Sequence, residues 1–248
     1  MLIYAATVIL SAWLLFLIQP LIAKQIFPWF GGASSVWIVA LMFFQVCLLG
    51  GYAYAHWSSS KLSVRAQSSL HIALLIAACA FMPVMPSDAW RPDAADDPSL
   101  RIFLLLSATV GLPCLLLSAT SPMLQAWYVR ERASEIPFWL FALSNIGSLV
   151  ALLSFPLIFE PAFDTRSLVI GWSIGFVAFA MSCAFVAWRT RSLSFLRTEP
   201  LETSASPRLP FFSAAFSADS ISFLDAKPAS RMNRFSCASG IRTFLQFK

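Results

Sequence analysis

Polar side chains lie beside prolines inside the apolar runs of this sequence, where they could contact a bound molecule. Gln19 precedes Pro20, and Lys24 follows about one turn later. Amides and hydroxyls donate and accept hydrogen bonds, and a lysine can hold an anionic group. Proline frees backbone carbonyls, which an apolar phase tolerates only where they are buried in protein or face water. The predicted cavity or substrate set is therefore Gln19, Lys24, Ser118, Thr120, Ser121, Gln125 and Asn145.

Alternatives to this polar set remain open at the sequence level. The prolines could merely kink their helices, with no ligand. Lys24 could extend to lipid headgroups, and Asn145 could hydrogen-bond a neighbouring helix within a patch of small residues.

Other chemistry has little support in the residue pattern. His56 and His71 lie apart with no cysteine or acid at ligand spacing, so we expect no metal site. His71 could handle protons or hydrogen-bond a neighbouring helix. The cysteines are scattered and indicate small apolar residues rather than disulfides. We find no catalytic arrangement and no phosphate-binding loop, and we predict no cofactor and no enzymatic activity.

The composition indicates a membrane-embedded chain. Of 248 residues, 58% are hydrophobic and 12% are charged, about half the roughly 25% typical of soluble domains. The net charge is +5, but the basic residues lie singly between apolar runs, which argues against a nucleic-acid partner. The lipid bilayer is the partner that we expect.

Six apolar runs have the length to cross a bilayer, and we predict an all-α protein with six transmembrane helices. The first has no charge before Lys24, so we interpret it as a retained span rather than a signal peptide. The third, which ends among prolines, is the least well defined. The runs are residues 2–23, 34–55, 69–85, 100–120, 138–159 and 168–188.

Basic residues between the runs favour a cytoplasmic N-terminus. With that orientation, the cytoplasmic segments hold Lys61, Arg65, Arg130, Arg132, Arg189 and Arg191. The outer loops hold Lys24, Arg91, Arg101 and Arg166. We therefore predict a multi-pass protein of the cell (inner) membrane with both termini in the cytoplasm.

Two domains are expected from the change in composition near residue 190. Residues 1–190 form the six-span domain. Residues 191–248 are rich in Ser, Phe and Arg and contain no run long enough to span, so they are predicted to be a cytoplasmic, mostly disordered tail.

The first three runs align with the last three. An offset of 102 positions superposes Pro20 on Pro122 and Trp37 on Trp139. A unit of three spans inverts its copy across the membrane, so the predicted fold is two inverted three-helix repeats, as in half of a major-facilitator transporter.

Several motifs extend this interpretation to a family. "FLIQPLIAKQIFPWFGGASSVW" (16–37), "GLPCLLLSATSPMLQAWY" (111–128) and "FALSNIGSLVALLSFPLIFEP" (141–161) resemble the membrane half of bacterial fused major-facilitator/spermidine-synthase-like proteins. The resemblance covers residues 1–188 and implies a transporter-like protein of unknown substrate. Longer members carry further spans and a soluble synthase-like domain. A second bundle, either a homodimer partner or a missing C-terminal half, is therefore an expected partner.

The same resemblance leaves a second interpretation open. The chain would then be a membrane anchor or regulatory remnant of a fused synthase-like protein that lacks its catalytic domain. A truncated or frame-shifted gene product fits this alternative.

Overall fold

The computed structural model describes residues 2–31, 34–87, 90–91, 98–132 and 138–196. The chain divides into two compact units, Met1–Thr198 and Glu199–Lys248. The second unit, and with it most of the predicted tail, lies outside the described residues. The last helix continues to Leu196, six residues beyond the domain boundary predicted at residue 190.

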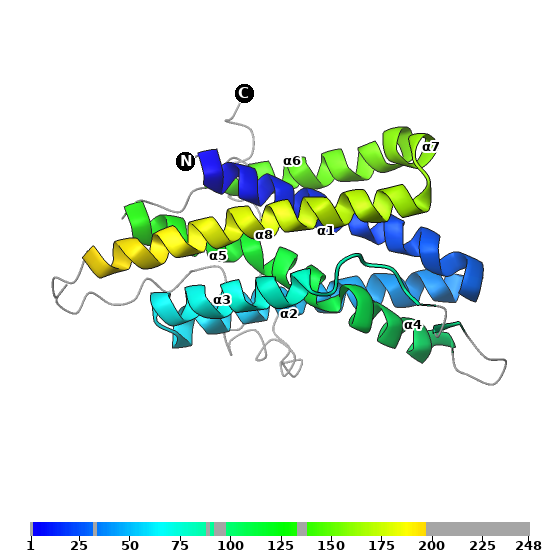
Figure 1. Cartoon of the computed structure of the whole chain (residues 1–248), viewed down its shortest axis with the longest axis horizontal. Helices are drawn as coiled ribbons and strands as arrows, with labels where there is room; N and C mark the ends of the chain where they lie inside the picture. The colour runs from blue at the N-terminus through cyan, green and yellow to red at the C-terminus, as the bar shows by residue number, and fades with distance from the viewer. Residues whose placement is uncertain (1, 32–33, 88–89, 92–97, 133–137, 197–248) are drawn as a thin grey trace, which may run out of the picture. The chain divides into compact units, whose positions relative to one another are not determined.

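All the regular structure in the described ranges is helical (Figure 1). The first three helices are α1 (Leu2–Phe30), α2 (Ser34–Lys61) and α3 (Val64–Cys79). A continuous helical segment follows, made of α4 (Pro98–Leu106), the π-helical turn η2 (Ser107–Gly111) and α5 (Leu112–Arg132). The last segments are α6 (Phe138–Ser154), η3 (Phe155–Phe159), α7 (Glu160–Ala162) and α8 (Thr165–Leu196).

Five of these segments are long and apolar enough to cross a membrane, so the chain is compatible with an integral membrane protein. They are Leu2–Phe30, Ser34–Lys61, Pro98–Glu131, Phe138–Ala162 and Thr165–Arg191. Each contains one of the predicted runs and extends beyond it.

The third predicted run differs most from the structure. Helix α3 has 16 residues and begins five residues before the predicted Ser69, because Ser63 caps it by accepting a 3.3 Å hydrogen bond from the Ala66 amide. It ends at Cys79, well before Met85, where two prolines in the following segment disfavour continued helix. Apolarity alone placed this run too far along the chain.

The prolines act in two different ways. Helix α1 contains Pro20 and helix α5 contains Pro122 without a change of helix type. The π-helical turns instead lie directly before Pro113 and around Pro156. A π turn accommodates the hydrogen bond that proline cannot donate. The helices therefore continue through Pro20 and Pro122.

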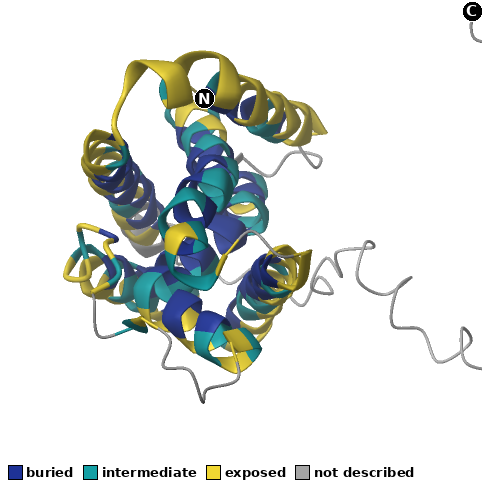
Figure 2. Cartoon of the chain, turned by 90° about the vertical axis from the view of Figure 1, so that its right-hand side faces the viewer, coloured by how far each residue is buried: buried dark blue, intermediate teal, exposed yellow. Residues whose placement is uncertain are grey.

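Helix α1 contacts α6, α8 and α5, and the segment Pro98–Glu131 has the most buried spanning window of the five. Helix α2 packs on α5 and α4, and α3 packs on α8. Viewed along the helices, buried residues line the inward faces and exposed residues the outer faces (Figure 2). Of these helices, α6 has the least buried spanning window.

Glycines set two of the closest helix contacts. A Cβ added at Gly51 of α2 would lie 2.7 Å from the Leu115 carbonyl oxygen of α5, and one at Gly147 of α6 would lie 2.9 Å from the Ile9 carbonyl oxygen of α1. Only glycine allows such an approach. Gly171 and Gly175 of α8 have G-x-x-x-G spacing, but a Cβ added at Gly171 would meet no atom within 4 Å, whereas one at Gly175 would lie 3.1 Å from the Leu14 side chain of α1.

Candidate functional site

The predicted cavity residues of α5 are largely engaged within the bundle. Ser118 is buried, and its hydroxyl lies 2.9 Å from the Leu115 carbonyl oxygen and 3.1 Å from that of Cys47 in α2. Thr120 is also buried and donates a 2.7 Å bond to the Leu116 carbonyl. These two hydroxyls therefore satisfy backbone carbonyls at or near the contact of α2 with α5.

Of the remaining predicted residues, Gln125 is buried, and the others are half-buried or exposed. Gln125 donates a 3.2 Å hydrogen bond to the hydroxyl of Ser121, one turn earlier on α5. Gln19 is half-buried on α1 and Asn145 is exposed on α6. Neither amide bonds a residue that the structure describes. The structure thus joins Ser121 to Gln125 but does not link either to Gln19 or Asn145 by a hydrogen bond.

Lys24 has a partner that the sequence analysis did not assign. Its ammonium nitrogen lies 3.6 Å from Oε1 of Glu160, and both side chains are partly exposed. The pair links the end of α1 to α7. Because α1 belongs to the first half of the chain and α7 to the second, this ion pair connects the two halves of the bundle.

A buried glutamine forms a polar centre at the opposite end of the bundle. Gln67 of α3 donates to the hydroxyls of Ser58 and Ser59 at 3.2 and 2.9 Å. Its Oε1 accepts a 3.1 Å bond from the Trp127 indole and a 3.4 Å bond from Arg130. Three helices, α2, α3 and α5, therefore meet at one fully buried amide.

His71 lies one turn along α3 from Gln67 and is fully buried. Its Nδ1 is 3.4 Å from the Tyr54 hydroxyl of α2, and its Nε2 is 3.5 Å from the Cys183 sulfur of α8. The Trp127 ring packs edge-on against the imidazole at 6.0 Å. The interpretation of His71 as a residue hydrogen-bonded to neighbouring helices is confirmed.

A carboxylate at the end of α5 connects three helices. Glu131 accepts a 2.6 Å hydrogen bond from the Tyr4 hydroxyl of α1 and pairs at 3.0 Å with Arg189 of α8. Its side chain is only 11% exposed, so this charge is mostly screened from water by its partners. In the sequence, Glu131 lies between Arg130 and Arg132, two of the basic residues that favour a cytoplasmic position.

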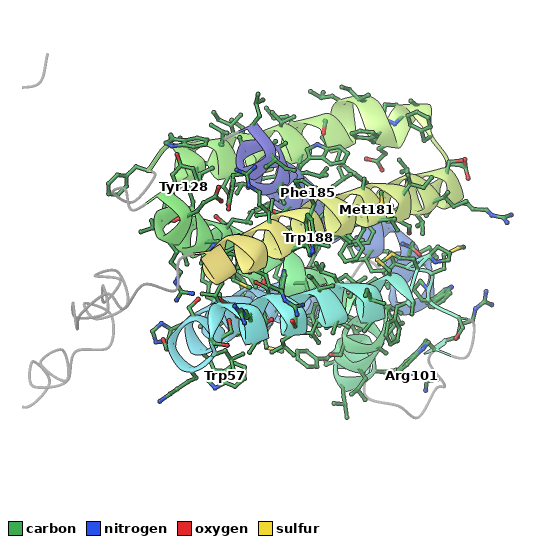
Figure 3. All side chains as sticks on the ribbon, turned by 60° about the vertical axis from the view of Figure 1, so that its left-hand side comes forward. Trp57, Arg101, Tyr128, Met181, Phe185 and Trp188 are labelled. Atoms are coloured by element: carbon green, nitrogen blue, oxygen red, sulfur yellow. The ribbon has the colours of Figure 1, made fainter. Side chains whose placement is uncertain are left out.

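Aromatic rings surround this polar end. Tyr128, labelled in Figure 3, contacts Tyr4 edge-on at 5.5 Å and Trp139 at 6.0 Å. Met181, Phe185 and Trp188 lie along an exposed side of α8 (Figure 3). Such a surface suits lipid acyl chains, with tryptophan near the headgroups.

The polar contacts lie near both ends of the bundle, and most of them connect α1, α2 or α3 to the segments from α4 to α8. Sequence reasoning missed Gln67, Glu131 and Tyr4; a lone acid among arginines at a helix end was the available signal. No protein-family model, curated protein or solved structure matches the chain.

Proposed function

We propose that the protein is a transporter-like integral membrane protein, built as half of a major-facilitator-type fold, with an unknown substrate. In this proposal α3 is a sixth span beside α8. Because α3 is shorter than the other spans, the segment after Cys79 completes the crossing. The two inverted units are then α1–α3 and the segments from α4 to α8. Their location is the cell membrane, with both termini cytoplasmic.

The observation that carries this proposal is an exchange of helix contacts. Helix α1 packs mainly on α6, and α2 packs mainly on α5. Suppose that α1 corresponds to α5 and α2 corresponds to α6. Exchanging the two units then turns the α1–α6 contact into the α5–α2 contact. The pairs α1 with α5 and α3 with α8 exchange into themselves. These exchanges support two related three-helix units, although α1 contacts α8 more extensively than α3 contacts α5.

The aromatic corners of the two units support the same correspondence. Trp37 of α2 packs edge-on against Phe27 of α1 at 5.2 Å. Trp139 of α6 packs edge-on against Tyr128 of α5 at 6.0 Å. Each tryptophan lies at the start of the second helix of its unit and contacts the end of the first. These are the tryptophans that the offset of 102 aligns.

The polar contacts near the two ends of the bundle fit alternating access. Tyr4–Glu131 joins the units at the predicted cytoplasmic end, and Lys24–Glu160 joins them at the predicted outer end. Alternating access requires that contacts between repeats form and break at either end. Gln19 and Ser121 are half-buried on α1 and α5, which contact each other, and they are the polar groups that we assign to a substrate path.

A membrane-anchor function is the second candidate, and one observation favours it. Ser118 and Thr120 use their hydroxyls on backbone carbonyls within the bundle, as residues of a purely structural helix contact do.

Accessibility to water separates the two functions. In a background without the native cysteines, Gln19→Cys and Ser121→Cys should react with a membrane-impermeant cationic thiol reagent in intact vesicles. Thr120→Cys, at a fully buried position, is the matched control and should not react. Protection of both test positions from either side of the membrane would contradict a substrate path and leave the anchor function.

Orientation is tested separately by reporters placed after residues 29, 61, 90, 132, 164 and 197. The proposal expects them to alternate outside and inside, beginning outside. A reporter after Arg132 on the outer side would overturn the orientation, and equal sides for residues 61 and 90 would remove α3 from the spans.

A further inference from the structure

An exposed amide marks a helix face that hydrocarbon cannot satisfy. Asn145 lies on α6, is exposed, and bonds no residue within the described ranges. The segment Phe138–Ala162 has 25 residues, about 37 Å at 1.5 Å per residue. If it is centred on a hydrocarbon layer of about 30 Å, Asn145 lies about 7 Å inside the boundary. This step rests on the proposed membrane insertion.

The alternatives within the chain do not remove this amide from lipid. Ser148 and Ser154, also on α6, donate to carbonyls one turn earlier, which is how a hydroxyl is satisfied on a lone helix. Asn145 carries two donor hydrogens and an acceptor oxygen, and nothing described in the chain bonds them. In hydrocarbon such groups find partners on other helices.

The residues around Asn145 form a seam suited to a helix partner. Positions spaced alternately by four and three residues point to one side of a helix, as in a left-handed helix pair. All six positions on this side are exposed. The five other than Asn145 are apolar. The seam comprises Phe138, Ala142, Asn145, Leu149, Leu152 and Pro156.

We propose that this α6 seam binds a second copy of the chain, with the two Asn145 amides hydrogen-bonded across a two-fold axis along the membrane normal. Copies inserted in the same orientation carry Asn145 at the same depth. A primary amide is complementary to itself, because each can donate N–H to the other's oxygen. An interface about a two-fold axis brings identical residues together in this way, and a single buried asparagine fixes the register of a helix pair.

Helix α2 offers a matched comparison. It carries the same spacing with an exposed glutamine at the third position: Ile38, Met42, Gln45, Leu49, Tyr52 and His56. However, α2 packs on both α4 and α5, whereas α6 packs mainly on α1. The seam on α6 therefore belongs to the more exposed helix, and Gln45 provides a control of the same chemistry.

The test measures association of the full chain in phosphatidylethanolamine/phosphatidylglycerol vesicles. Protein with donor or acceptor dyes on an N-terminal tag is diluted over a range of protein-to-lipid ratios, and energy transfer reports dimers. Wild type should dimerise. Asn145→Leu should weaken dimerisation by about threefold to tenfold, Asn145→Gln should weaken it less, and Gln45→Leu should leave it unchanged.

Three results would overturn the inference. They are a wild-type chain that stays monomeric at every ratio, an Asn145→Leu variant that associates as wild type does, and an equal loss in Gln45→Leu. In each case lipid or a different chain covers the α6 seam. Alkaline carbonate extraction distinguishes the two proposals: release of the chain contradicts membrane insertion and this inference together, whereas an integral monomer contradicts this inference alone.

Discussion

The Tyr4 hydroxyl donates a 2.6 Å hydrogen bond to Oε2 of Glu131, although 127 residues separate them. The other carboxylate oxygen pairs with Arg189 of α8. One carboxylate thus fixes the positions of α1, α5 and α8 at the same end of the bundle. Hydrogen bonds to charged groups contribute more than neutral ones, and more still where water is excluded.

Replacing Glu131 should therefore destabilise the bundle. Glu131→Ala removes both bonds and leaves the Tyr4 hydroxyl without its close partner, so we expect a loss of about 1.5 to 3 kcal/mol of unfolding free energy. Tyr4→Phe should cost about 1 kcal/mol. Denaturant unfolding in detergent micelles measures both, with Tyr52→Phe on the exposed side of α2 as the control. A Glu131→Ala variant as stable as wild type would show that this contact contributes nothing.

Gly51 and Gly171 should respond oppositely to alanine. Gly51→Ala would place a methyl 2.7 Å from the Leu115 carbonyl oxygen, so α2 and α5 must separate, at a cost of about 1 to 3 kcal/mol. Gly171→Ala meets nothing within 4 Å and favours helix, so stability should be unchanged or slightly higher.

Thermal unfolding of the two glycine variants in the same detergent tests this pair. Gly147→Ala is a second test case, because its Cβ would approach the Ile9 carbonyl oxygen at 2.9 Å. Equal melting temperatures for Gly51→Ala and Gly171→Ala would mean that α2 and α5 do not approach as closely as the structure has them.

Gln67 should be the most sensitive of the buried amides. Gln67→Leu leaves the Trp127 indole N–H without its acceptor and the Ser58 and Ser59 hydroxyls without a donor. A buried donor left unsatisfied costs about 1 to 3 kcal/mol. Gln45→Leu, on an exposed face, is the matched control and should change the stability of the monomer little. Comparable losses in the two variants would argue that Gln67 is not the centre of a buried network.

Asp164 should titrate below the ordinary range for an aspartate. Its carboxylate accepts hydrogen bonds from the hydroxyl and the amide of Ser167, at 2.6 and 3.3 Å. These bonds lower the pKa of the carboxyl, the hydroxyl bond having the larger effect. Because the folded pKa is the lower one, the stabilisation is present above the unfolded value of about 3.9 and is lost as pH falls through the folded pKa.

The Ser167 amide resonance followed against pH by NMR tests the Asp164 prediction. Its midpoint should lie below about 3.9, the ordinary value for aspartate. Asp164→Asn keeps an acceptor for the amide but cannot titrate, so its resonance should be flat through this range. If the wild-type midpoint lay at the ordinary pKa of aspartate, the Asp164 side chain would not be hydrogen-bonded to Ser167 at the start of α8.

The sequence alone determined that the chain forms long apolar helices. A run of about twenty apolar residues satisfies its own backbone hydrogen bonds only as a helix where water is absent. Composition therefore predicted five of the six segments, although it ended some of them too early, as at residue 120 where α5 continues to Arg132. Segment α3 was placed too late, because its start depends on the Ser63 cap rather than on apolarity.

The tertiary structure decided which polar residues meet. Gln67 and Glu131 looked like loop residues in the sequence, and their partners lie up to 127 positions away. Gly51 and Gly171 sit in equally apolar runs, yet one lies at a helix contact and the other does not. In a chain that is apolar on nearly every side, periodicity cannot say which face meets a neighbour. Only the packing of α1 against α5, α6 and α8 turns Tyr4 toward Glu131 and leaves Asn145 facing outward.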